Sequence, residues 1–166
     1  MKRLEAFIGK TVDRVGYGLA AILILMVLNV ALDVIMRYLF HTGSVGMQEM
    51  EWHLFSLVIL FGVGYGLRHE GHVRVDFIYD RLSDRKKALI NIMGTVFMLI
   101  PLALLIFAGS FGYVNDAYTT GEISEDPGGL PYRWIIKSMI PLSFAFLLLS
   151  ATGYVLKNIK IIREAK

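Results

Sequence analysis

Four long runs of apolar residues dominate the pattern of hydrophobic and polar positions along the chain. The runs cover about residues 15–36, 50–67, 88–113 and 134–156, with short tails outside them and three connections between them. A helix that rises 1.5 Å per residue needs about 20 apolar residues to cross the hydrocarbon core of a bilayer. The pattern therefore predicts an all-α integral membrane protein, with four transmembrane helices in a single membrane domain over residues 1–166.

Two shorter segments show the alternation of an amphipathic helix. One covers about residues 3–14, before the first run, and the other covers about residues 73–83, in the connection between the second and third runs. In both segments apolar residues recur at helical spacing while charged residues lie on other faces. We expect two short helices that lie in the membrane interface, the second forming an elbow. Pro101 and Pro141, inside the third and fourth runs, predict kinks in those helices.

Basic residues are distributed unevenly among the tails and connections. The N-terminal tail, the middle connection and the C-terminal tail hold fourteen of the 17 Lys and Arg residues, and the other two connections hold only Arg37 and Arg133. The positive-inside rule therefore predicts that both termini and the middle connection are cytoplasmic. The net charge of +3 follows from this asymmetry, so no nucleic-acid partner is needed to explain it.

The stretch "GVGYG" at Gly62–Gly66 has the look of a potassium-channel filter. In a channel such carbonyls line a re-entrant loop, whereas here the motif ends a full-length apolar run and leads into a basic connection. Gly62 and Gly66 also form a G-x-x-x-G face, which lets helices pack closely. We favour the packing interpretation and keep an ion channel subunit as an alternative function.

Histidines raise a second alternative, a haem-bearing four-helix membrane anchor of a redox enzyme. Such an anchor needs paired axial histidines that face one another from different helices. His69 and His72 lie just past one end of the second run, while His41 and His53 lie near the other. No ligands at recognisable zinc spacing accompany them. We therefore expect no metal and no cofactor.

Polar residues inside the apolar runs cluster toward the predicted outer side. Asn29, Asp33 and Arg37 are spaced four apart, so they form one stripe on the first helix. We expect Asp33 to pair with Arg37, with a direct part in ion or proton movement as the alternative. Glu49, at a similar depth, is expected to be a second partner for Arg37. Lys137, one turn into the fourth run, is expected to reach outward or to join this cluster.

Several motifs, taken in order, resemble one known family. "RYLF" closes the first run, "QEMEW" opens the second, "RHEGHVRVD" follows it, and "GLPYRWIIKSMIPLSF" leads into the fourth. Together, from Arg37 to about Ser150, they resemble the small membrane subunit of tripartite ATP-independent periplasmic (TRAP) transporters. The positions that match the family's pattern are Arg37, Glu49, Gly62, His72, Asp76, Pro131, Trp134 and Pro141. One departure is Gln48-Glu49, where relatives often carry two adjacent acids.

The resemblance implies a scaffold without catalytic or substrate-binding residues, in the inner membrane of a bacterium. Its expected partners are the lipid bilayer, a large multi-span subunit that carries substrate and sodium, and a periplasmic substrate-binding protein that captures an organic anion. The resemblance also suggests a role for the acidic connection before the fourth run. We expect Glu122, Glu125 and Asp126 to contact the binding protein.

Overall fold

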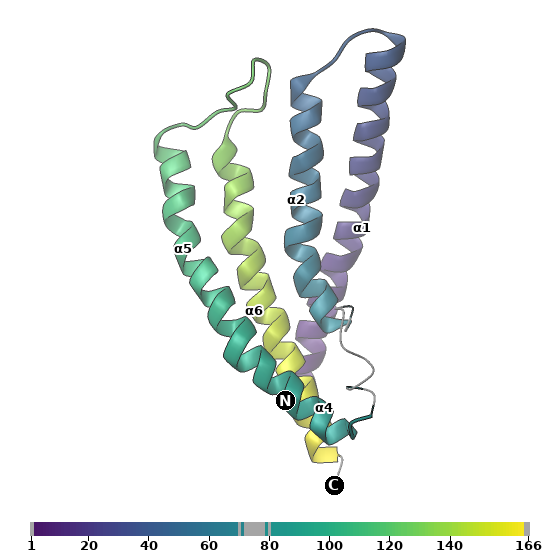
Figure 1. The fold of residues 1–166 in the computed structure, drawn as a ribbon, viewed down its shortest axis with the longest axis vertical. Helices are drawn as coiled ribbons and strands as arrows, with labels where there is room; N and C mark the ends of the chain where they lie inside the picture. Colours follow the sequence, from purple (N-terminus) through teal and green to yellow (C-terminus); the bar gives the residue numbers. More distant parts are fainter. Residues whose placement is uncertain (1, 70, 72–78, 80, 165–166) are drawn as a thin grey trace.

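The computed structural model describes residues 2–69, 71, 79 and 81–164, and the secondary structure of these residues is helical (Figure 1). The elements are α1 (Lys2–Leu39), α2 (Val45–Arg68), α4 (Asp84–Gly94), the π-helical turn η1 (Thr95–Leu99), α5 (Ile100–Thr119) and α6 (Arg133–Glu164). Because α4, η1 and α5 are continuous, the described chain has four helical stretches that are long and apolar enough to cross a membrane. The prediction of an all-helical protein with four candidate spans is confirmed.

The N-terminal segment differs from its prediction. Residues 3–14 do not form a separate helix, because α1 continues without a break from Lys2 to Leu39. No proline or capping sequence interrupts the chain at this point. Ile8 and Val12 are buried against Phe146 of α6, so protein contacts hold this segment on the bundle. Of the predicted elbow helix at 73–83, residues 73–78 and 80 lie outside the described residues.

The third span contains an irregular turn where a kink was predicted. Pro101 lacks a backbone N–H and cannot complete the regular hydrogen-bond ladder. The π-helical turn η1 ends just before it, and the N–H of Ile100 donates to the carbonyl of Thr95, five residues back. A π-turn beside a proline is a common way for a long helix to change direction. Pro141, by contrast, is buried inside the continuous helix α6.

The helices pack most closely at the end that holds both termini. Figure 1 shows the pairs α1–α2 and α5–α6 together at this end and apart toward the loops 40–44 and 120–132. Most of the residues in the two buried apolar clusters follow the same division, since they come from the start of α1, the end of α2 and the middle of α6, with Ala103 of α5 beside them. Helix α6 is the most buried span, with 39% of its most apolar window buried against 11% in the other three.

Glycines make this close packing possible. A Cβ added to Gly64 of α2 would lie 2.8 Å from the Phe146 ring, and one added to Gly153 of α6 would lie 2.8 Å from Ile8. Lipid tails are as apolar as side chains, so helices in a bilayer associate largely through such tight contacts. The terminus end is therefore the packed end of the molecule.

Candidate functional site at the loop end

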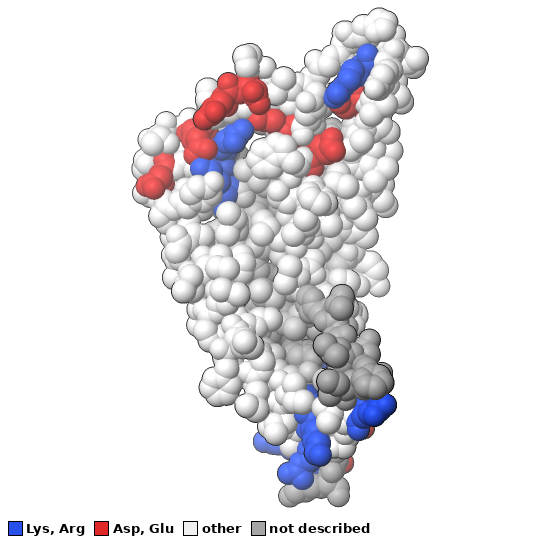
Figure 2. All heavy atoms as spheres, viewed as in Figure 1, with Lys and Arg blue, Asp and Glu red and all other residues white. Residues whose placement is uncertain are grey.

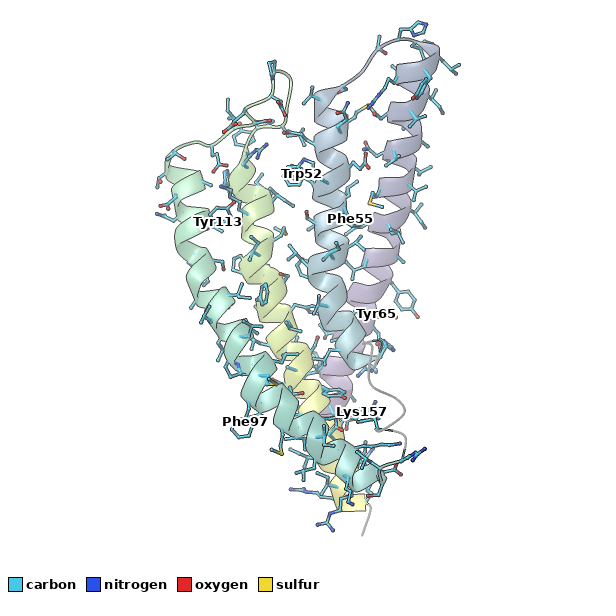
Figure 3. All side chains as sticks on the ribbon, in the orientation of Figure 1. Trp52, Phe55, Tyr65, Phe97, Tyr113 and Lys157 are labelled. Atoms are coloured by element: carbon cyan, nitrogen blue, oxygen red, sulfur yellow. The ribbon has the colours of Figure 1, made fainter. Side chains whose placement is uncertain are left out.

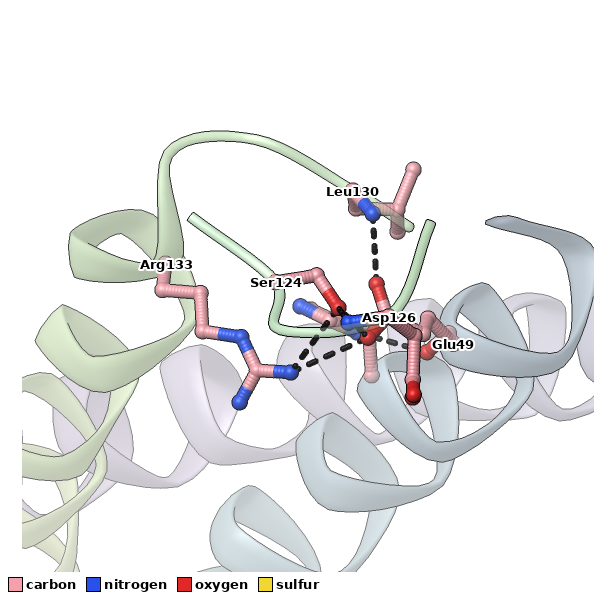
Figure 4. Close-up of polar contacts among 6 residues, drawn as sticks. Glu49, Ser124, Asp126, Leu130 and Arg133 are labelled. Carbon is pink, nitrogen blue, oxygen red and sulfur yellow. Dashed lines mark hydrogen bonds and ion pairs between the residues drawn. The ribbon is translucent and has the colours of Figure 1, made fainter. Parts of the chain in front are cut away.

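Glu49 of α2 is the centre of a polar network at the loop end (Figure 4). The residue is only 5% exposed, and its carboxylate accepts hydrogen bonds from three groups. The Ser124 hydroxyl donates over 2.5 Å, the Leu130 N–H over 2.5 Å, and the Arg133 guanidinium over 3.0 Å. A carboxylate with three donors, one of them charged, is well compensated for its burial. Glu49 therefore fastens the loop 120–132 and the start of α6 to α2.

This arrangement corrects the expected pairing of Glu49 with Arg37. The Ser44 side chain accepts from the Met47 N–H and starts α2 at Val45, so Glu49 already lies on a regular helix. Its side chain there faces the loop and α6. Arg37 instead pairs with Asp33 on its own helix, as predicted, while Asn29 donates to the Met47 carbonyl over 2.9 Å. All three polar residues of this stripe on α1 thus form defined contacts.

Lys137 joins a second ion pair in the same region. Its ammonium group binds the Glu122 carboxylate and lies 4.0 Å from the centroid of the Tyr113 ring. Glu122 is therefore engaged within the chain, although 34% of its side chain is exposed. Glu125 and Asp126 are exposed and remain available.

The loop 120–132 is ordered by its own backbone contacts as well. The Arg133 N–H donates to the Glu122 carbonyl over 3.1 Å, and the Ser124 N–H donates to the Leu130 carbonyl over 3.3 Å. Gly128 adopts a φ of +83°, which glycine tolerates and most residues do not. Trp134 packs edge-on against Tyr118 at 5.5 Å, and Pro131 before it is exposed. These contacts give the loop a defined shape.

A different polar cluster lies at the opposite end of α2. Asp13 of α1 accepts from Arg68 at 2.9 and 3.1 Å and lies 3.1 Å from a ring nitrogen of His69. The "GVGYG" stretch that precedes it is regular helix, with Gly64 buried against α6, which does not match a re-entrant filter. His53, near the start of α2, contacts the carbonyl of Glu49. His53 and His69 thus occupy opposite ends of one helix.

The remaining predicted site residues are dispersed. Gly62 is open, since a Cβ there would meet nothing within 4 Å, and Gly66 is half-buried on the same helix. Pro141 is buried in α6. His72 and Asp76 lie outside the described residues. Within the described chain, no cluster of three or more His, Asp or Glu side chains has the geometry of a metal site.

Sequence reasoning missed several residues that the structure brings together. Ser124 and Arg133 bind Glu49, Asp13 binds Arg68, and Asn158 of α6 accepts a hydrogen bond from Asn91 of α4 over 3.0 Å. These partners are separated by many residues, so no helical spacing links them. Only Arg133 carried a signal, because it was one of two basic residues in otherwise acidic or neutral connections.

Charge is divided between the two ends of the molecule (Figure 2). Lys and Arg side chains gather where α4 begins and α6 ends, while Asp and Glu gather with a few basic side chains around the loop 120–132. The helical surface between them is largely uncharged on the face shown. A helical bundle with an uncharged belt and charged ends defines a multi-pass membrane protein.

Comparison with known proteins identifies the kind of membrane protein. Residues 26–160 match the family described as tripartite ATP-independent periplasmic transporters, DctQ component. The ectoine TRAP transporter small permease protein of Halomonas elongata is 31% identical over 160 residues, which cover 90% of this chain and 77% of that protein. The C4-dicarboxylate TRAP transporter small permease protein of Pseudomonas aeruginosa is 29% identical, over 60% of this chain and 50% of that protein.

A longer relative matches as well. The sialic acid TRAP transporter permease protein of Haemophilus influenzae is 22% identical over 84% of this chain, but the match covers only 20% of that permease. The chain belongs to the DctQ family and is a small permease subunit of a TRAP transporter. It is a transport protein and not an enzyme.

Proposed function

We propose that this chain is a scaffold that anchors the large membrane subunit of its transporter in the bilayer. In this proposal the large subunit takes up an organic anion with sodium, after a periplasmic binding protein has captured it. The main support is that three ion pairs near the loop ends of the spans are closed inside the chain: Asp33–Arg37, Glu49–Arg133 and Lys137–Glu122. Charges bound to one another serve structure better than they serve a moving substrate.

Large apolar surfaces support a membrane partner. Many apolar side chains of α1, η1 and α5 are more than half exposed in this chain, among them Phe97 of η1 at 73% and Leu105 of α5 at 70%. Lipid covers part of such a surface, and a partner subunit is proposed to cover the rest. The sialic acid permease of Haemophilus influenzae adds support, because there a segment similar to this chain is part of one much longer permease.

We also propose that both termini are cytoplasmic and that the loops 40–44 and 120–132 face the periplasm of a bacterium. The basic residues at the terminus end support this orientation through the positive-inside rule. It places Glu125 and Asp126 where a soluble binding protein would dock. The loop that carries them is held by Glu49 and Lys137, so it presents these acids in a fixed geometry.

Co-purification with the large subunit tests the scaffold proposal. Gly62→Leu adds bulk to an open position of α2, whereas Gly64→Leu adds it at a contact inside the chain. We expect Gly62→Leu to reduce recovery of the large subunit while leaving the thermal unfolding of this chain unchanged. Gly64→Leu is expected to lower both. Full co-purification and uptake with Gly62→Leu would contradict a role for this face.

Charge reversal tests the docking surface separately. Glu125→Lys with Asp126→Lys is expected to slow uptake at low salt, because like charges then meet where opposite charges steered the binding protein. The matched control is Glu164→Lys, an exposed acid at the other end of the molecule. If the variant and the unchanged protein take up substrate equally at every salt concentration, the loop is not part of the docking site.

A further inference from the structure

A cleft opens between α2 and the α5–α6 pair in the loop half of the molecule. It has a volume of about 440 Å³ and lies between Phe55 and Ile59 on α2, Tyr113 on α5 and Ile140 on α6. Arg133 and Lys137 lie at the outer end of its α6 wall. In Figure 3, Trp52 extends from the side of α2 that faces α6. The cleft is therefore apolar along most of its length and cationic at one end.

The guanidinium of Arg133 has unused donor capacity. Its Nη2 donates to Glu49 over 3.0 Å and to Ser124 over 3.4 Å. Its Nε is buried without an acceptor among the described residues, but 27% of the side chain is exposed, so part of the guanidinium faces the cleft that Arg133 lines. Arginine presents adjacent N–H groups in a fork that suits two oxygens of one phosphate.

We propose that this cleft holds a phospholipid from the leaflet on the side of the loop 120–132. The phosphate accepts from Arg133, and one acyl chain runs between Phe55, Ile59 and Ile140. The order of polar and apolar groups along the cleft is that of a lipid, which has a phosphate at the interface and hydrocarbon below it. Arg133 and Lys137 are each paired with a carboxylate, so the charges of the site are already balanced. A headgroup without net charge therefore suits the site better than a lipid with a net negative charge.

The size of the cleft suits part of a lipid. A volume of about 440 Å³ is in the ordinary range for a small amphipathic ligand, and a phosphate with the upper part of one acyl chain is such a group.

Photolabelling tests the location of the lipid. The transporter complex is reconstituted in nanodiscs with phosphatidylethanolamine that carries a photoreactive group on one acyl chain, and adducts are mapped by mass spectrometry. We expect adducts concentrated in residues 55–60 and 136–140. Ile59→Trp, which fills the cleft from a position that is 50% exposed, is expected to lower this labelling several-fold. Leu142→Trp, an exposed position outside the cleft lining, is the control and leaves it unchanged.

Two further variants test the phosphate contact. Arg133→Gln and Glu49→Gln both break the same ion pair, but only the first removes the cation. We expect Arg133→Gln to lose phospholipid labelling, Glu49→Gln to keep it, and a diacylglycerol probe without phosphate to label both variants equally. Equal loss in both variants would overturn the proposal. The proposal would also be overturned by adducts spread evenly over the exposed helices. It would be overturned as well if the large subunit covered the cleft and kept residues 55–60 and 136–140 from being labelled.

Discussion

The two ends of this bundle hold their helices together in different ways. At the terminus end, glycines bring backbones close, so that Gly64 lies against Phe146 and Gly153 against Ile8. At the loop end the helix pairs separate, and the contacts are directional ones to Glu49 and Lys137. Close packing dominates at the terminus end, with a few polar contacts beside it, whereas hydrogen bonds and ion pairs join the loop end above an open cleft.

This difference follows from the solvent around each contact. In hydrocarbon, helices gain little from burying apolar surface and depend on close packing. Near the interface, hydroxyl, amide and guanidinium groups of a loop and the following helix donate hydrogen bonds to one carboxylate, here that of Glu49. The packed end therefore determines how the helices cross, while the polar end determines the shape of the loop. Changes at the two ends are expected to have different consequences.

The largest expected effect is on the packed end, from Gly64→Leu. A side chain at this position collides with the Phe146 ring, and overpacking of this kind costs about 1–3 kcal/mol, occasionally more. Thermal unfolding in detergent is expected to shift downward by several degrees. Gly62→Leu, two residues earlier, meets nothing within 4 Å and serves as the control. Equal unfolding temperatures for the two variants would show that the contact between Gly64 and Phe146 does not determine how α2 packs on α6.

The next effect is local to the polar end, from Glu49→Gln. The amide keeps one acceptor oxygen and loses the charge, so the Leu130 N–H, the Ser124 hydroxyl and Arg133 no longer share a carboxylate. Hydrogen exchange of the Leu130 amide is expected to speed up about tenfold, as for the loss of one charge-assisted hydrogen bond. Exchange in α6 near Phe146 should not change.

Glu51→Gln is the matched control for this variant. Glu51 lies two residues further along α2, and the three hydrogen bonds that hold the loop go to Glu49. Its neutralisation leaves the three donors to Glu49 in place. If Glu51→Gln speeds exchange of Leu130 as much as Glu49→Gln does, general charge and not the specific network orders the loop.

Sequence pattern predicted the spans and the contacts within one helix better than the contacts between distant residues. Four apolar runs of membrane length specify four helices, and Asp33–Arg37 follows from a spacing of four. The continuity of α1 was missed, because amphipathic character at residues 3–14 fits both an interfacial helix and a helix packed on Phe146. Glu49–Arg133 joins residues 84 positions apart. Only the fold brings such partners together, so the helical spacing of residues in the sequence does not predict them.

A polar contact buried inside the packed end has a smaller expected effect. Asn158 is 2% exposed, accepts from Asn91 over 3.0 Å and donates to the Tyr154 carbonyl over 2.9 Å. Asn158→Leu is expected to cost about 1 kcal/mol, the usual scale for a hydrogen bond between membrane helices. Thermal unfolding measures this cost, with Asn115→Leu at an exposed position of α5 as control. A neutral Asn158→Leu would mean that shape alone joins α4 to α6.

The smallest effect is expected at the Asp13–Arg68 pair, which belongs to the packed end but lies near water. Both side chains are about one third exposed, at 37% and 35%. Ion pairs with this exposure contribute about 0.2–1 kcal/mol, and salt screens them over a Debye length of about 8 Å at physiological ionic strength. A double-mutant cycle of Asp13→Asn and Arg68→Gln, measured by thermal unfolding, is expected to show a coupling that shrinks as salt is raised. Coupling that persists in high salt would mean that this pair, like Glu49–Arg133, is shielded from solvent, and the contrast between the two ends would then lie in glycine packing alone.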